Sequence, residues 1–345
     1  MPLTLTPLRG MPEVPAGADL ASLVVAAVGA AGERLADGDV LVVSSKVVSK
    51  ALGLWAEDGD DREAVIASQT RRVVAERWSG ERATRIVHSV AGPVMAAAGV
   101  DASNTGGTDR LLLLPADPDA QARSLRAALL ERSGCARLGV VLSDTAGRPW
   151  RSGQTDFALG AAGVQVLDDL RGATDADGRP LAVTTRAIAD ELAAAADLVK
   201  GKADGVPVAL VRGAGAWVGL DDGVGAAALV RTGREDWFAY GRAEAVRASL
   251  GVEPGTPAAG ECGIPAVLPE PVPDRIGRAV RVALHALPDV GIDAGSADLR
   301  VSADDPYSLG RAVARLEAAL WGEGLAAEAP DSPAGLEVVV RISEL

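Results

Sequence analysis

Residues 138–160 have the sequence LGVVLSDTAGRPWRSGQTDFALG, which is the most informative stretch of this chain. Its first six residues are nearly all apolar, which predicts a buried strand over 138–143. Residues 144–163 are rich in Gly, Arg, Thr and Asp, which favours a functional loop. A carboxylate beside a hydroxyl, as in Asp144-Thr145, suits a divalent cation, and the paired Arg148 and Arg151 suit phosphate or carboxylate groups. The alternative is a merely structural loop, which rarely needs so many different functional groups.

Hydrophobic periodicity on both sides of this stretch predicts alternating helices and strands. Asp19 is placed to cap a first helix, and Pro118 suits the first position of another that ends near Ser133-Gly134. A polar, acidic loop is expected at 57–61. The expected helices cover roughly 20–36, 62–78, 118–133 and 186–200. The expected strands are 39–44, 85–90, 110–115, 138–143 and 206–213.

The character of the chain changes after about Tyr240. Prolines cluster between 254 and 273, which predicts a linker. We expect a main domain over 1–240, a Pro-rich linker over 241–273 and a small α+β appendage over 274–345. Within the appendage, helices are expected at 274–287 and 308–322 and a strand at 335–342.

Composition excludes several classes of function. The formal net charge of −13 argues against nucleic-acid binding. Two cysteines are too few for a disulfide framework or a zinc site, and only His88 and His285 are available as imidazole ligands. A metal site would therefore rest on oxygen ligands, which suits Mg²⁺ or Mn²⁺. No signal peptide and no apolar run long enough to span a membrane is visible, so a cytoplasmic protein is expected.

Three further segments carry polar groups at places where ligands bind. SSKVVSK (44–50) puts Ser45, Lys46 and Lys50 at the end of a predicted strand, where α/β sheets hold anions. GVDASNTGGTD (99–109) places short oxygen-bearing side chains among glycines, which suits a metal or a phosphate. DLVKGKADG (197–205) places Lys200 and Lys202 at a helix end. The alternatives are solvated strand-end lysines, an ordinary turn and a charged helix cap, respectively. No P-loop or dinucleotide-binding glycine motif is present.

Taken in order, these segments resemble the coenzyme F420-0:L-glutamate (gamma-glutamyl) ligase family. The resemblance rests on DVLVVSSKVVSKALG, AGVDASN, LLLLPADPDAQA, GVVLSDTAGRPWRSGQTDFALGAAGV, ADELAAAADLVKGKADGVPVALVRG and RGMPEVPAGADL, and it covers nearly all of residues 1–240. It implies a mixed α/β (α+β) fold distinct from a Rossmann domain, and an intertwined homodimer. It also implies a GTP-dependent ligase that adds L-glutamate to the deazaflavin precursor F420-0.

The resemblance also implies roles for individual residues. It implies that Asp101 and Asp144 bind one divalent cation, Mg²⁺ or Mn²⁺, and that Thr145 binds a second. K⁺ is expected as a further ion. The GTP contacts are expected at Met11, Pro12, Glu13, Val14, Ser45, Lys46, Lys50, Asn104, Lys200, Gly201, Lys202, Ala203, Asp204, Gly205, Val206 and Pro207.

The implied chemistry is attack of the precursor carboxylate on the γ-phosphate of GTP, followed by amide formation from the acyl phosphate. The product is F420-1, with longer γ-linked glutamate tails if the reaction repeats. Carboxylate and triphosphate repel each other, so cations are needed. We expect Arg148, Arg151, Lys46 and Lys50 to neutralise the charge that develops. Asp156 is expected to orient the incoming amine or to accept its proton.

Two residues depart from the family pattern. Lys202 stands near a position where relatives carry a Gln or Glu that holds the second metal, and Ala97 replaces a frequent Asn. These departures motivate one alternative, a non-catalytic nucleotide- or deazaflavin-binding protein. The other alternative is a GTP-dependent ligase for a different acid or amino acid. The segment after 240 is too short for a nitroreductase-like domain, so FMN binding is not expected.

Overall fold

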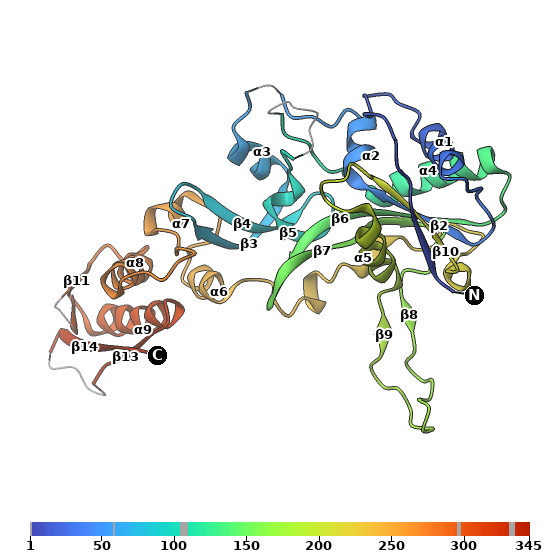
Figure 1. The fold of residues 1–345 in the computed structure, drawn as a ribbon. Helices are drawn as coiled ribbons and strands as arrows, with labels where there is room; N and C mark the ends of the chain where they lie inside the picture. The colour runs from blue at the N-terminus through green and yellow to red at the C-terminus, as the bar shows by residue number, and fades with distance from the viewer. Residues whose placement is uncertain (1, 58, 104–109, 295–297, 331–334) are drawn as a thin grey trace. The chain divides into compact units, whose positions relative to one another are not determined.

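A mixed five-stranded sheet carries the stretch 138–160 in the computed structural model (Figure 1). The structure describes residues 2–57, 59–103, 110–294, 298–330 and 335–345. The sheet order is β1-β10-β2-β6-β7, in which only the central β2–β6 pair is parallel. Its strands are β1 (Thr4–Pro7), β10 (Val208–Arg212), β2 (Asp39–Ser44), β6 (Leu138–Arg148) and β7 (Arg151–Ala162). This mixed sheet confirms an α/β fold that is not a Rossmann domain.

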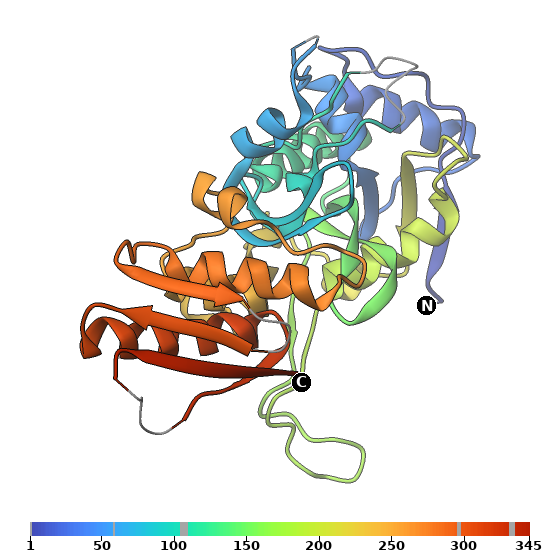
Figure 2. The same cartoon turned by 90° about the vertical axis from the view of Figure 1, so that its left-hand side faces the viewer.

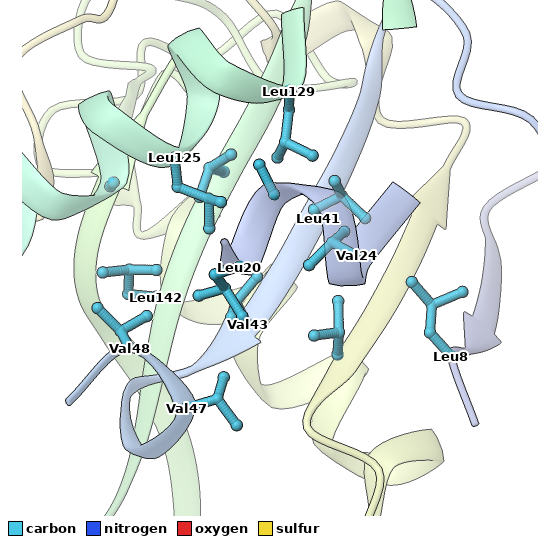
Figure 3. Packing of buried hydrophobic residues seen from close by; sticks show 14 of the residues in the cluster. Leu8, Leu20, Val24, Leu41, Val43, Val47, Val48, Leu125, Leu129 and Leu142 are labelled. Carbon is cyan, nitrogen blue, oxygen red and sulfur yellow. The ribbon is translucent and has the colours of Figure 1, made fainter. Parts of the chain in front are cut away.

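Helices cover both faces of this sheet. The first face is covered by α1 (Leu20–Ala30), α2 (Ser45–Ala51) and α4 (Pro118–Ser133), and the second by α5 (Ile188–Lys200). Figure 3 shows Val24 of α1 and Leu129 of α4 over Leu41 of β2, and all three side chains are buried. Because Val40 and Val42 point to the opposite face and pack with α5, β2 is apolar on both faces from Val40 to Val43.

The chain divides into two compact units. Unit 1 comprises residues up to Arg71 together with His88–Thr232, and unit 2 comprises Arg72–Val87 and Gly233–Leu345. The chain passes from unit 1 to unit 2 within β3 (Thr70–Trp78) and returns within β4 (Ala83–Ser89); these strands precede β5 (Val94–Ala96) in a three-stranded sheet.

Unit 2 has a core of its own. The antiparallel sheet order is β11-β12-β14-β13, with two long helices packed on it. Its elements are α6 (Arg242–Ser249), α7 (Pro257–Cys262), α8 (Val272–Leu284), β11 (Val290–Ala294), β12 (Asp298–Ala303), α9 (Pro306–Gly322), β13 (Leu325–Glu328) and β14 (Glu337–Glu344). Figure 2 shows α8 and α9 side by side over the sheet. Residues 241–273, expected as a linker, hold helices α6 and α7.

A two-stranded arm extends from unit 1 (Figures 1 and 2). It consists of β8 (Asp168–Asp169), β9 (Thr185–Arg186) and the segment between them, most of which is exposed. In the described part of the chain, no helix has both the length and the apolarity needed to span a bilayer.

Several expected helices and strands are confirmed, and capping residues explain where the helices begin and end. Asp19 accepts a hydrogen bond from Ser22 N, and Asp117 accepts one from Ala120 N at the start of α4. Gly134, with φ of 71°, ends α4 where it was expected. The first helix ends at Ala30, six residues earlier than expected. The reason is that Gly32 adopts φ of 75°, which a right-handed helix cannot contain.

Three other expectations were wrong. Only Arg62–Ser68 (α3) of 62–78 is helical. The residues that follow include the β-branched Thr70, Val73 and Val74 and form β3, in which Val74 and Glu76 are buried on one face. Residues 110–115 form no strand in the described chain, where Leu112 only bridges Trp55 and Asp101. Residues 144–163 are not a loop but the long β6–β7 hairpin, whose polar side chains pair across the two strands.

Candidate functional site

Four chain segments meet at one edge of the main sheet because of its topology. β2 and β6 are parallel with Ser44 opposite Ser143, so the residues directly after Ser44 and directly after Ser143 lie close together. β10 is antiparallel to β2, so the segment before it reaches the same edge, where Ser44 N donates to Pro207 O at 2.8 Å. Leu8 N donates to Val208 O at 2.9 Å, which brings the N-terminal segment to that edge.

A cavity of about 540 Å³ opens at this edge, and we call it the sheet-edge pocket. It is lined by Met11, Pro12, Glu13, Val14, Ser44, Lys46, Val47, Lys50, Ser143, Asp144, Thr145, Asp156, Asp197, Lys200, Gly201, Lys202, Gly205, Val206 and Pro207. Most of these residues were expected from the sequence. Four lysines face four carboxylates around the cavity, so the charges that line it cancel.

The most buried part of the pocket is an ion pair that is supported by further hydrogen bonds. Lys200 and Asp156 are 3% and 5% exposed, and their charged atoms are 2.8 Å apart. Ser143 and Thr145 each donate a hydroxyl to Asp156, at 2.8 and 2.7 Å. Burial opposes ionisation of Asp156, but the Lys200 charge and these hydrogen bonds outweigh it and hold its pKa below the usual range. Asp156 is therefore a poor proton acceptor.

Asp144, one residue before Thr145, has the opposite electrostatic environment. No described side chain donates a hydrogen bond to its carboxylate. Burial raises the pKa of Asp144 to about 6, and the neighbouring charges of Asp156 and Asp101 also raise it. The backbone of Thr145 and the charge of Lys202 only partly offset this. Negative charge is thus under-compensated at Asp144.

Asp101 lies close to Asp144, although 43 residues separate them in the chain. Both line a smaller cavity together with Ser45, whose hydroxyl is fully buried and has no hydrogen-bond partner among the described residues. Lys46 lies 2.6 Å from Asp101 Oδ2, and Ser103 N donates to Oδ1 at 2.6 Å. Burial opposes ionisation of Asp101 too, but these contacts lower its pKa below the usual value.

The remaining lysines of the pocket hold single partners. Lys50 is buried and pairs with Glu13 of the N-terminal segment. Lys202 is exposed and donates to Thr145 Oγ1 at 2.6 Å. Ammonium groups with exposed partners can exchange them for a phosphate oxygen, whereas Lys200 cannot do so without leaving Asp156 unpaired.

Some expected site residues are not in this pocket. Arg148 and Arg151 lie at the tip of the β6–β7 hairpin, exposed and outside the lining. Ala203 and Asp204 are exposed in the turn between Lys202 and Gly205. Asn104 lies outside the described residues.

An oxygen-only cation site fits the corner formed by Asp101, Asp144 and Ser45. Its donors would be the two carboxylates and the Ser45 hydroxyl, a set that suits Mg²⁺ or Mn²⁺, whereas the Thr145 hydroxyl is bonded to Asp156 and Lys202. The raised pKa of Asp144 and the unpartnered Ser45 hydroxyl are features that a bound cation would relieve. Within the described ranges, no cluster of three or more Asp, Glu, His or Cys side chains is arranged to hold a metal, so hydroxyl, solvent or substrate oxygens would complete the shell.

Four lining residues were not predicted as site residues: Ser44, Val47, Ser143 and Asp197. Ser143, the last residue of the apolar run 138–143, donates to Asp156. Asp197 precedes Lys200 by three residues on α5, and burial raises its pKa. Helical spacing places Asp197 on the same face as Lys200, so its position was predictable once the helix was recognised.

Sequence comparisons show which family the chain is similar to. The family model described as F420-0:gamma-glutamyl ligase matches residues 10–213. The coenzyme F420:L-glutamate ligase of Halobacterium salinarum is 43% identical over 223 residues, which cover 59% of this chain and 84% of that protein. The enzyme of the same description from Methanothermobacter thermautotrophicus is 41% identical over 229 residues, covering 62% and 90%. That of Natronomonas pharaonis is 41% identical over 227 residues, covering 59% and 83%.

Proposed function

This chain belongs to the F420-0:gamma-glutamyl ligase family, and from that premise we propose that it uses GTP to join L-glutamate to the deazaflavin precursor F420-0. It is a ligase of coenzyme F420 biosynthesis, as its relatives are. The proposed product is F420-1, extended further if the new γ-carboxylate is used again. The observation that carries the proposal is that four of the six matched segments, far apart in sequence, converge on one pocket.

We place GTP in the sheet-edge pocket, which has the volume for a ligand of this size. The apolar residues of the N-terminal segment would contact the nucleoside. Lys46, Lys50 and Lys202 would neutralise the phosphates because each holds a partner that a phosphate oxygen can replace. Asn104, Ala203 and Asp204 stay proposed GTP contacts.

The charge balance of the pocket supports a requirement for metal. Its four lysines are already matched by Glu13, Asp144, Asp156 and Asp197, so a triphosphate and a substrate carboxylate add negative charge that the protein does not neutralise. We propose that Asp101 and Asp144 hold one Mg²⁺ or Mn²⁺, with Thr145 beside it and K⁺ as an accessory ion. A divalent cation there supplies charge neutralisation and Lewis acidity toward the phosphates. Lys46 would leave Asp101 for a phosphate as the cation binds.

The proposed chemistry has two steps. A carboxylate oxygen of F420-0 attacks the γ-phosphorus, the bond to the bridging oxygen breaks, and GDP leaves. The α-amine of L-glutamate then attacks the acyl carbon, phosphate leaves with its oxygen, and the amine loses a proton to solvent. Asp156 acts as a positioning residue, since its carboxylate holds Lys200 and the Thr145 hydroxyl in place. We assign neutralisation to the lysines, because Arg148 and Arg151 lie outside the lining.

A homodimer is proposed as the working form. The β8–β9 arm extends from unit 1 in both views and exposes apolar side chains such as Val183, which is 87% exposed. A long exposed arm with few contacts to its own unit suits exchange between two copies.

Mass spectrometry of the protein with GTP, Mn²⁺, L-glutamate and F420-0 tests the proposal. We expect glutamyl mass increments on F420-0 with matching GDP release, and none when ATP replaces GTP. GTP binding without GDP release would favour a non-catalytic protein. GDP release only with another acid or amino acid would retain the ligase class but reject these substrates.

A further inference from the structure

Unit 2 contains a second polar cavity, of about 410 Å³, which we call the arginine pocket. It lies outside the family match except for Arg77. Arg77, Arg242, Arg275 and Arg278 line one part of it, and the apolar segment Pro265–Pro269 lines another.

Most of the charges around this pocket pair with one another. Arg77 pairs with Glu244, Arg85 lies 3.4 Å from Glu76, and Arg278 binds both Glu270 and Glu323, at 2.7 and 2.6 Å. A fourth guanidinium, Arg247, is buried close to Glu76 and Glu323. Four arginines thus balance four glutamates, and this network holds α6, α8 and the end of α9 to β3.

Two lining arginines remain outside this balance. Arg242 has no ion pair or hydrogen bond among the described residues and only stacks on Trp321, with its guanidinium carbon 5.3 Å from the ring centre. Arg275 donates to the backbone carbonyls of Glu323 and Gly324, lies 3.8 Å from the largely exposed carboxylate of Glu344, and its charge also lowers the pKa of Glu270. The pocket therefore carries an excess of positive charge in a protein whose net charge is −13.

The two guanidinium groups also converge on one point. A Cβ atom added to Gly324 would lie 3.0 Å from Arg275 Nη2 and 3.3 Å from Arg242 Nη2, so these nitrogens are at most about 6 Å apart. Two like charges held this close repel each other. Arg275 Nη2 donates to the Glu323 and Gly324 carbonyls, so an oxyanion here would accept charge-assisted hydrogen bonds from Arg242 and from Arg275 Nη1. Gly324 has φ of 74° and lacks a side chain that would occupy the space.

We propose that the arginine pocket binds a small oxyanion, a phosphate or a carboxylate, between Arg242 and Arg275. An apolar part of the ligand would lie against Pro265–Pro269 and Trp321; Val267 and Leu268 of that segment are 58% and 76% exposed. This gives the C-terminal unit a binding role separate from the ligase site. Phosphate and γ-glutamyl carboxylates are the two sources of such an anion that the proposed reaction supplies.

Fluorine NMR of the full chain labelled with 5-fluorotryptophan tests the proposal at the site itself. The Trp321 signal, identified by its loss in Trp321→Phe, is followed during separate titrations with inorganic phosphate and γ-glutamylglutamate, and with sodium chloride at matched ionic strength. We expect a saturable shift with at least one oxyanion, weakened at least tenfold in Arg242→Gln. Arg311→Gln is the matched control, because Arg311 is an exposed arginine of α9 outside the pocket.

The response to each titrant identifies the ligand. A shift with phosphate alone assigns a phosphate site, and a shift with the dipeptide alone assigns a carboxylate site. The proposal is overturned if neither shifts the signal, if chloride produces the same shift, or if Arg242→Gln responds like the wild type.

Discussion

The two halves of the sheet-edge pocket are built from neighbouring residues but differ in how their charges are balanced. In one half, Asp156 accepts hydrogen bonds from Ser143, Thr145 and Lys200, and its pKa is low. In the other half, burial and nearby carboxylates raise the pKa of Asp144. The first half is complete without a ligand, whereas the second is under-compensated. The difference indicates that the Asp156 half is structural and that the Asp144 half binds the cation.

The largest effect is expected from Asp144→Asn on catalysis. Removing the charge should lower kcat/KM for glutamate addition by roughly a thousandfold, because metal assistance is worth several kcal/mol of barrier. Steady-state GDP release with saturating Mn²⁺ measures it. Near-normal turnover in this variant would show that the Asp144 half does not bind the catalytic cation.

The next largest effect is on the stability of the complete half. Lys200→Met should cost about 3–5 kcal/mol of unfolding free energy, because it leaves Asp156 buried and unpaired. Lys202→Met is the matched control, since this lysine lies two residues away and is exposed; it should change stability by less than about 0.5 kcal/mol.

Chemical denaturation of both lysine variants provides the measurement. In an Asp156→Asn background the cost of Lys200→Met should shrink, because no buried charge then loses its partner. Equal costs for the two single lysine variants would show that the buried pair is not structural.

A smaller effect of opposite sign is expected for the under-compensated half. Without metal or GTP, Asp144→Asn should stabilise the fold above pH 7, by at most about 3 kcal/mol, the equivalent of moving a carboxyl pKa from 3.8 to about 6. Folded wild-type protein holds the Asp144 proton more tightly than unfolded protein, so its stability rises as the pH falls through 6 toward 4. The advantage of the variant should therefore disappear near pH 4. Thermal unfolding of both proteins between pH 4 and pH 8 measures this difference. If the variant were less stable than the wild type at pH 8, the Asp144 charge would stabilise the fold, contrary to what we expect.

The smallest effect is expected at the hairpin tip. Arg148→Ala and Arg151→Ala should each change kcat/KM by less than about threefold and stability by less than about 0.5 kcal/mol, as for exposed residues without buried partners. The same GDP-release assay applies. A hundredfold loss of kcat/KM in either variant would show that the arginines neutralise charge during the reaction.

The sequence predicted the main sheet well where local signals agreed. The apolar run of β2, the cap at Asp19 and Pro118 at the first helical position placed the starts of their elements correctly. It failed at β3, because helical spacing and strand alternation overlap in a short mixed segment, and only pairing with β4 decides between them. The β6–β7 hairpin was missed because its polar side chains pair across strands, a contact that composition does not reveal.

For the site, the sequence identified most of the residues that line the pocket but not how they pair. The sequence assigned Asp144 to a metal and Asp156 to the incoming amine, and it placed Lys200 and Lys202 together at a helix end. It did not show which of these charged groups pair with each other. These residues differ in burial and in their partners, which lie far along the chain: Lys200, for example, binds Ser143 and Asp156. The register of the parallel β2–β6 pair, with Ser143 opposite Ser44, helps to place these partners. Strand register is set by the whole sheet, so no local pattern could separate the structural half from the half that is under-compensated.

Binding of Mn²⁺ in the presence of GTP, followed by electron paramagnetic resonance of the free ion, tests the account most directly. Wild type and Lys200→Met/Asp156→Asn should both bind Mn²⁺, whereas Asp144→Asn should bind it at least a hundredfold more weakly. If Asp144→Asn bound Mn²⁺ as tightly as the wild type, the cation would lie elsewhere and Asp144 would not be its ligand.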